Sequence, residues 1–222
     1  MPKEALRVLR MGTVDYGEAL ELQRKLAHAR IHGEIEDTLL LLQHPPTITI
    51  GRAGKRQHLL AGEEVLQRER IGLFEVERGG DITYHGPGQL VGYPILDLND
   101  HGRDAHQYLR RIEEVLISTL EDFDIRAGRR AGLTGVWVGH RKIASIGIHL
   151  SRWVTWHGFS LNVDMDLSPF QWIVPCGISG LEMVSMASIL GKAISPDEVA
   201  EHVTGHFSRV FPLMNRGSGL IA

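Results

Sequence analysis

The stretch between residues 135 and 163 constrains the fold more than any other part of this chain. Its apolar residues fall into three short runs within "GVWVGHRKIASIGIHL" and "WVTWHGFSLNV". "GHRK" separates the first two runs, and "SR" follows the third-to-last apolar residue pair to separate the second run from the last. Short runs rich in β-branched and aromatic residues, broken by tight turns, are typical of consecutive hairpins. The sequence therefore predicts three adjacent strands here.

Further strands and a few helices are predicted on either side of these hairpins. Apolar runs predict strands at residues 5–12, 37–44, 47–51, 72–78 and 88–98. Apolar spacing and capping residues predict helices at 14–33, 61–70, 104–123 and 195–211. Because the strands outnumber helices scattered between hairpins, we expect an α+β fold with a mixed, mostly antiparallel sheet and helices on one side of it. A regular doubly wound α/β fold is the less favoured alternative.

Length and composition are those of one globular domain. The chain has 222 residues, of which 43% are hydrophobic, and a formal net charge of -3. We expect a single domain over residues 1–213 and a flexible tail over 214–222. The near-neutral charge argues against nucleic-acid binding, and no apolar run approaches the roughly 20 residues that span a bilayer. With one cysteine and no apolar core of a secretory signal near the N-terminus, the sequence predicts a cytoplasmic protein.

Three segments combine glycines with side chains that could carry chemistry. The first, "RGGDITYHGPGQ" at residues 78–89, lacks the spacing of known phosphate-binding loops, and an ordinary tight turn is its alternative explanation. In the second, Ala144, Ser145 and Gly147 follow Lys142, and in the third, Gly158 and Ser160 interrupt a bulky strand. Small residues at such positions leave volume for a ligand, which larger side chains would fill.

Cys176, the single cysteine, stands between Pro175 and Gly177. Proline fixes the backbone on one side, and glycine leaves the approach to its own N–H open as a possible oxyanion donor. A nucleophilic thiol also needs a nearby cation or helix N-terminus to favour the thiolate. The alternative is a buried and inert cysteine, just as Lys142 taken alone could be a solvated surface charge.

The histidines give no strong metal signal. His202 and His206 are spaced to share one face of a helix, but the glutamate of the HExxH zinc motif is absent between them. We therefore expect no metal site.

Taken together, the motifs resemble those of a known family. "HPPTITIGR", "RGGDITYHGPGQLVGYPILDL", "GVWV", "KIASIGIH", "GFSLNV" and "FQWIVPCGISG" occur in the order found in lipoyl(octanoyl) transferases. That family belongs to the biotin/lipoate protein ligase superfamily, whose fold the resemblance implies for residues 37–189. One departure is Ser160, which stands where the family pattern has alanine.

The resemblance implies transfer of an octanoyl or lipoyl group from octanoyl-acyl carrier protein to a lysine of a lipoyl domain, without a cofactor. The implied acceptors are the lipoyl domains of 2-oxoacid dehydrogenase E2 subunits and the glycine cleavage H protein. The implied catalytic pair is Cys176 with Lys142, which lie 34 positions apart in the sequence. The implied substrate-binding residues are Arg78, Gly79, Gly80, Asp81, Ile82, Thr83, Tyr84, His85, Ser145, Ile146, Gly147, Gly158, Phe159 and Ser160.

Three other functions remain open from the sequence. An ATP-dependent lipoate ligase would share the fold but would have no use for the cysteine. A cysteine-dependent thioester hydrolase would pair Cys176 with His85 or His149. A catalytically silent acyl-binding module would bind substrate without forming a covalent adduct.

Overall fold

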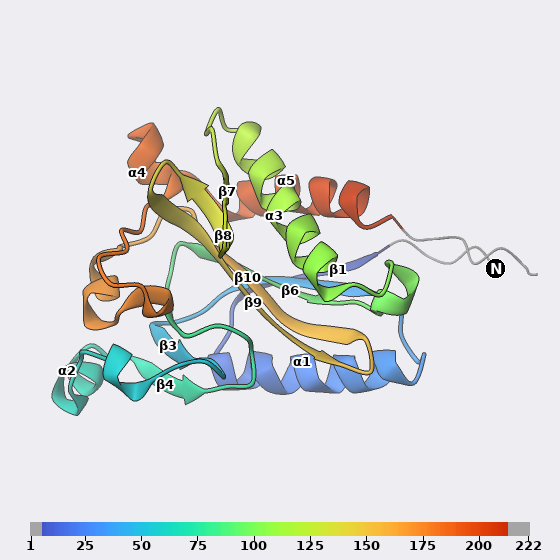
Figure 1. Cartoon of the computed structure of the whole chain (residues 1–222), viewed down its shortest axis with the longest axis horizontal. Helices are drawn as coiled ribbons and strands as arrows, with labels where there is room; N and C mark the ends of the chain where they lie inside the picture. Colours follow the sequence, from blue (N-terminus) through green and yellow to red (C-terminus); the bar gives the residue numbers. More distant parts are fainter. Residues whose placement is uncertain (1–5, 213–222) are drawn as a thin grey trace, which may run out of the picture.

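The computed structural model describes residues 6–212 and has the α+β architecture predicted from the sequence (Figure 1). Within that range, seven strands form a large sheet in the order β1 (Arg7–Thr13), β2 (Thr38–Gln43), β6 (Gln89–Ile95), β10 (Val154–Asn162), β9 (Arg141–Ser151), β8 (Leu133–Val138) and β7 (Gly128–Arg130). β1 and β2 are parallel, and every other neighbouring pair in this sheet is antiparallel. The predicted tail at 214–222 lies outside the described residues.

A second, smaller sheet has the order β4 (Gly72–Glu75), β3 (Thr47–Ile50) and β5 (Ile82–His85). β5 is the second half of the glycine-rich segment that starts at Arg78, and all four of its residues are buried. The two sheets thus meet at this segment, because its first half also contacts the large sheet: the Gly79 N–H donates a hydrogen bond to Ile148 O on β9 at 2.8 Å.

Helices cover both faces of the large sheet, so the expected one-sided arrangement was wrong (Figure 1). The main helices are α1 (Tyr16–Ile31), α3 (Ala105–Glu121) and α5 (Pro196–Val210), with the shorter α2 (Glu63–Arg68) and α4 (Met186–Leu190) beside them. Leu39 and Leu41 of β2 belong to the core under α3 and α5, whereas Leu40 and Leu42 pack with Ala19 of α1. A strand that is apolar at four consecutive positions has to be covered on both sides.

The buried face of α1 contains polar residues. Asp15 caps its N-terminus through hydrogen bonds from Gly17 N and Glu18 N. Gln23 and Arg30 are buried on the same face as Ala19. Gln23 Oε1 accepts a hydrogen bond of 2.9 Å from the backbone N–H of His157 on β10. The first turn of α1 and this contact bring the helix against the strands that carry the glycine-marked segments.

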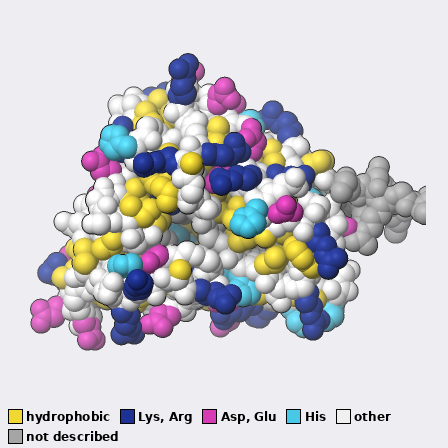
Figure 2. Space-filling model, in the orientation of Figure 1, with side chains coloured by type: hydrophobic (Ala, Val, Ile, Leu, Met, Phe, Trp, Pro, Cys, Tyr) yellow, Lys and Arg dark blue, Asp and Glu magenta, His cyan; other side chains and the backbone are white. Residues whose placement is uncertain are grey.

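None of the helices within residues 6–212 is long and apolar enough to cross a membrane. On the face drawn in Figure 2, Lys and Arg side chains are interspersed with Asp and Glu side chains. This mixture agrees with the small net charge of the chain.

Asp37, next to β2, is a buried carboxylate that joins three segments. Its Oδ1 accepts hydrogen bonds from Arg30 Nε at 2.7 Å and from Asp97 N at 3.0 Å, and its Oδ2 is 2.7 Å from His101 Nε2. Burial opposes ionisation, but the hydrogen bonds from His101 and Arg30 outweigh it and hold the pKa of Asp37 below its ordinary value.

Asp37→Asn is therefore expected to lower the free energy of unfolding by about 3 kcal/mol at pH 7, because it breaks a buried ion pair. A carboxylate with a lowered folded-state pKa stabilises the protein above its unfolded-state pKa of about 4, and this contribution is lost as the pH falls further. Urea unfolding of both proteins should show their difference shrinking in acid. An equal difference at pH 7 and at pH 3 would contradict this account.

Candidate active site

Lys142 enters the site from the first turn of β9, and its side chain is buried, with 4% of the residue exposed. Its Nζ donates a hydrogen bond to Cys176 Sγ at 3.2 Å and lies 5.3 Å from the centre of the Trp137 ring. The backbone of Lys142 is bonded on both sides to the chain that follows the cysteine, through Glu182 O and Val184 N. Strand, aromatic ring and backbone contacts together hold the amine in place.

Space for the lysine side chain comes from Gly135 on β8. A Cβ atom at this position would lie 2.5 Å from Lys142 Cε, and the φ of Gly135 is +126°, which side-chain-bearing residues rarely adopt. The Gly135 N–H in turn donates to Oε1 of the buried Glu113 at 3.0 Å. The glycine thus lets β8 pass directly beside the amine.

Cys176 lies in a short 3-10 turn, η4 (Pro175–Gly177), and is half-buried. Its φ of 57° is left-handed, an uncommon and strained conformation for a residue with a side chain. Gly177 is also left-handed at 69°, and a Cβ there would lie 2.5 Å from Asp81 Oδ2. The turn therefore requires glycine after the cysteine.

The Gly177 N–H is already used within this turn. It donates to Val174 O at 2.9 Å, so the sequence-based suggestion that it is an oxyanion donor was wrong. The glycine serves the backbone conformation and the close approach to Asp81, and not the reacting carbonyl.

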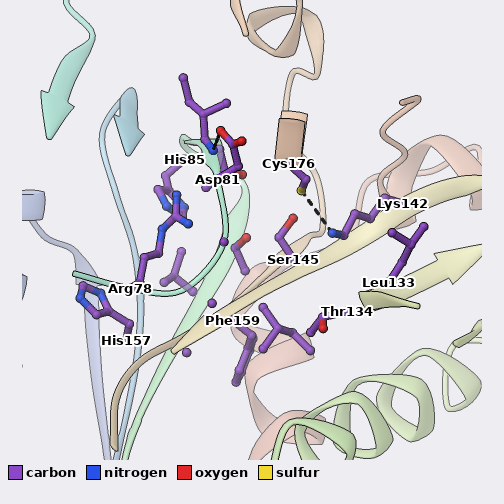
Figure 3. Close-up of a pocket in the computed structure, with 18 of the residues that line it drawn as sticks. Arg78, Asp81, His85, Leu133, Thr134, Lys142, Ser145, His157, Phe159 and Cys176 are labelled. Carbon is purple, nitrogen blue, oxygen red and sulfur yellow. Dashed lines mark hydrogen bonds between the residues drawn. The ribbon is translucent and has the colours of Figure 1, made fainter. Parts of the chain in front are cut away.

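A cavity of about 200 Å³ opens beside the sulfur and the amine (Figure 3). Its middle is lined by apolar and small residues, among them Ile146, Gly147 and Phe159, and polar side chains lie at both ends. An apolar cavity that ends at a thiol suits an acyl chain whose carbonyl is attached to sulfur.

Two glycines of the cavity wall allow close backbone crossings. A Cβ at Gly147 would lie 2.7 Å from Gly79 O, and one at Gly158 would lie 2.2 Å from Gly92 O. The small residues of β9 and β10 thus let neighbouring chain segments approach, in addition to leaving volume for a ligand.

Burial controls the charge state of the groups around the cavity. It lowers the pKa of His85 to about 3 and raises that of Tyr16 to about 12, so both side chains are neutral near pH 7. Burial also lowers the pKa of Arg78, whose guanidinium donates to the carbonyl and hydroxyl oxygens of Thr49.

The chain matches the family model described as "Lipoyl protein ligase A/B catalytic domain" over residues 15–208. A protein of Solibacter usitatus named octanoyltransferase is 55% identical over 213 residues, which cover 96% of each chain. A second octanoyltransferase, from Desulforamulus reducens, is 46% identical over 93% of this chain and 91% of its own. The chain belongs to the octanoyltransferase family. It is an acyltransferase, and the family resemblance of its motifs is confirmed.

The solved structure of lipoate-protein ligase A bound with ATP shares this fold, with a TM-score of 0.72 and 16% identity over 93% of this chain and 85% of that one. The biotin/lipoate protein ligase-like fold predicted from the motifs is therefore confirmed as well.

Most of the site residues expected for an octanoyltransferase lie around the one cavity. Those that line it are Cys176, Lys142, Arg78, Gly80, Asp81, Ile82, Thr83, His85, Ser145, Ile146, Gly147, Gly158, Phe159 and Ser160. Gly79 and Tyr84 do not line it. The ring of Tyr84 packs on Phe170 under the small sheet, with 5.7 Å between ring centres, and Gly79 is tied to β9 through its N–H.

The sequence did not single out several further residues that line the cavity of this octanoyltransferase. They are Tyr16, Val91, Tyr93, Gly132, Leu133, Thr134, His157 and Ile178. His157 directly precedes the expected Gly158, and Tyr16 directly follows the Asp15 cap. Their positions were visible in the sequence, but nothing there showed that α1 and β10 would share a cavity.

Neither histidine considered for a hydrolase contacts the thiol. His85 Nδ1 is 2.8 Å from Gln89 Oε1, and His149 Nδ1 is 3.0 Å from Glu77 O. His202 and His206 both contact Asp122 Oδ2, at 2.6 and 2.8 Å. Among residues 6–212 no group of three or more His, Cys, Asp or Glu side chains is arranged to hold a metal ion.

Proposed function

We propose that this octanoyltransferase carries the acyl group on Cys176, as a thioester between the donor and the acceptor lysine. The observation that carries the proposal is the 3.2 Å contact between Lys142 Nζ and Cys176 Sγ at the end of an apolar cavity. An ammonium at this distance favours the thiolate, which is the nucleophilic form of cysteine.

In the first half-reaction the thiolate attacks the carbonyl of the donor thioester. The tetrahedral intermediate collapses, the carbon–sulfur bond to the donor breaks, and the departing thiolate takes a proton from Lys142. One thioester replaces another, so this step needs no other source of free energy.

In the second half-reaction the ε-amine of the acceptor lysine attacks the Cys176 thioester. The neutral Lys142 takes the proton that the incoming amine loses, and the sulfur leaves as the thiolate that began the cycle. Formation of an amide from a thioester drives this step, and neither ATP nor a metal ion takes part.

The proposed donor is octanoyl-acyl carrier protein. The proposed acceptors are the lipoyl domains of 2-oxoacid dehydrogenase E2 subunits and the glycine cleavage H protein, and the proposed compartment is the cytoplasm. A reducing compartment would keep the half-buried thiol available for reaction.

A thioester hydrolase is less favoured because Cys176 is paired with an amine and not with an imidazole. An ATP-dependent ligase shares the fold but would leave the pair of Cys176 and Lys142 without a role.

Intact mass measurement after incubation with octanoyl-acyl carrier protein alone tests the proposal. We expect one octanoyl group on the wild-type protein, none on Cys176→Ala, and transfer of the bound group to a lipoyl domain added afterwards without ATP. A protein that modifies the lipoyl domain at the wild-type rate with Cys176 replaced would rule out the covalent route. Octanoate release without transfer would identify a hydrolase.

A further inference from the structure

The buried end of the cavity is lined by polar side chains that a plain hydrocarbon chain would not need. At the other end, Cys176 is half-buried and Gly132 and Thr134 are exposed, which makes that end the mouth. Figure 3 shows Cys176 and Lys142 on one side of the cavity and Arg78 and His157 on the other. The buried polar residues of this far end are Tyr16, Arg78, His85, Tyr93 and His157.

An acyl chain attached to Cys176 has a suitable length to approach His157. His157 on β10 pairs with Ile148 on β9, six residues along the strand from Lys142. Six residues of strand span about 20 Å. Eight carbons joined by bonds of about 1.5 Å give a chain of roughly 10 Å. The lysine side chain and the imidazole ring both project into the remaining space, so the eighth carbon would end close to His157.

His157 is buried without hydrogen bonds to its ring. It is 1% exposed, and neither Nδ1 nor Nε2 has a hydrogen-bond partner among the described residues. Its Nε2 is 3.8 Å from Glu77 Oε2, which is beyond hydrogen-bond distance. Burial lowers the pKa of His157, so the ring is neutral and presents one donor and one acceptor.

The backbone at His157 is also strained. Its φ is +55° in the interior of β10, where a side-chain-bearing residue is disfavoured. Buried polar groups without partners are rare because each costs free energy, and strained residues are concentrated at ligand sites. Both observations point to a ligand atom as the missing partner of the ring.

Most other polar groups at this end already have partners. Tyr93 OH is 2.7 Å from His44 Nε2, and Arg78 is bonded to Thr49. Tyr16 is different, because no hydrogen bond joins its hydroxyl to another described residue, and its high pKa keeps the hydroxyl protonated. His157 and Tyr16 are thus the two groups of this end that are left to recognise a ligand.

We propose that His157 and Tyr16 form a subsite for a heteroatom at the far end of the acyl chain. The enzyme would then accept medium-chain acyl groups with a hydroxyl group or a sulfur atom near the eighth carbon, and not only plain octanoyl groups. This inference rests on the proposed function, because it takes the chain to be attached to Cys176. A purely apolar end would reject a hydroxyl group, since burying it without a partner is costly.

The test compares acylation of Cys176 by the pantetheine thioesters of octanoate and 8-hydroxyoctanoate. For the wild-type protein we expect similar rates, or a faster rate with the hydroxylated chain. His157→Leu should lower the ratio of the hydroxylated to the plain rate by about tenfold or more. His149→Leu is the matched control, because His149 lies on the neighbouring strand outside the cavity lining and should leave the ratio unchanged.

Tyr16→Phe is a second variant, which removes one hydroxyl group and should lower the same ratio without depending on the folding of His157→Leu. A wild-type protein that disfavours the hydroxylated chain at least tenfold, or a ratio that neither variant changes, overturns the subsite. Absence of any octanoyl adduct would instead refute the proposed function. In that case calorimetric binding of octanoate and 8-hydroxyoctanoate decides on the subsite alone.

Discussion

Replacing Lys142 with methionine is expected to slow acylation of Cys176 by about 10² to 10⁴, the usual contribution of a positioned proton donor. Methionine is unbranched and of similar length, so it can keep the contact with Trp137 in the buried site while it removes the charge. Without the ammonium at 3.2 Å the sulfur loses a hydrogen-bond donor, and the departing thiolate of the donor loses its proton source. The rate of octanoyl adduct formation, followed by intact mass, measures the effect.

A second measurement separates the two roles of the lysine. Alkylation of Cys176 by iodoacetamide needs the thiolate but no proton donor, so at pH 7 it should also slow in Lys142→Met, though by less than acylation does. Lys192→Met, at an exposed lysine after α4, is the matched control and should leave both rates unchanged. Wild-type acylation by Lys142→Met would exclude the lysine from the reaction.

The elements of the fold were predictable because their patterns are local. β8, β9 and β10 follow from short apolar runs between turns, and α5 begins at Pro196 after the predicted Ser195 cap. The arrangement of the helices was less predictable. The buried face of α1 includes Gln23 and Arg30, whose burial depends on partners far away in the sequence, so apolar spacing alone could not define that face.

The site was predictable as a set of motifs but not as a geometry. Residue patterns marked Cys176 and the small residues of β9 and β10, and only the family resemblance paired the cysteine with Lys142. The role given to the Gly177 N–H failed because the hydrogen bond to Val174 depends on the conformation of the turn. His157 was missed because its importance lies in what its ring does not contact, which no sequence pattern records.

Gly135→Ala is expected to damage both stability and activity. The added Cβ would lie 2.5 Å from Lys142 Cε and 2.7 Å from Ala144 O. The lysine side chain can yield, but doing so moves the amine away from the sulfur, while the carbonyl belongs to the backbone of β9 and yields only at a cost. We expect acylation to slow by about tenfold or more and the free energy of unfolding to fall by about 2 to 3 kcal/mol, as for other overpacked positions.

Gly139→Ala separates the clash from the cost of the backbone conformation. Gly139 lies in the turn between β8 and β9 with a φ of +61°, and a Cβ there would meet no atom within 4 Å. That variant carries only the cost of a left-handed residue, about 1 kcal/mol, and should acylate at the wild-type rate. Urea unfolding and adduct formation, measured on both variants, decide the matter. If Gly135→Ala is no less stable than Gly139→Ala and acylates normally, the absence of a side chain at residue 135 is not what holds the amine of Lys142 against the sulfur.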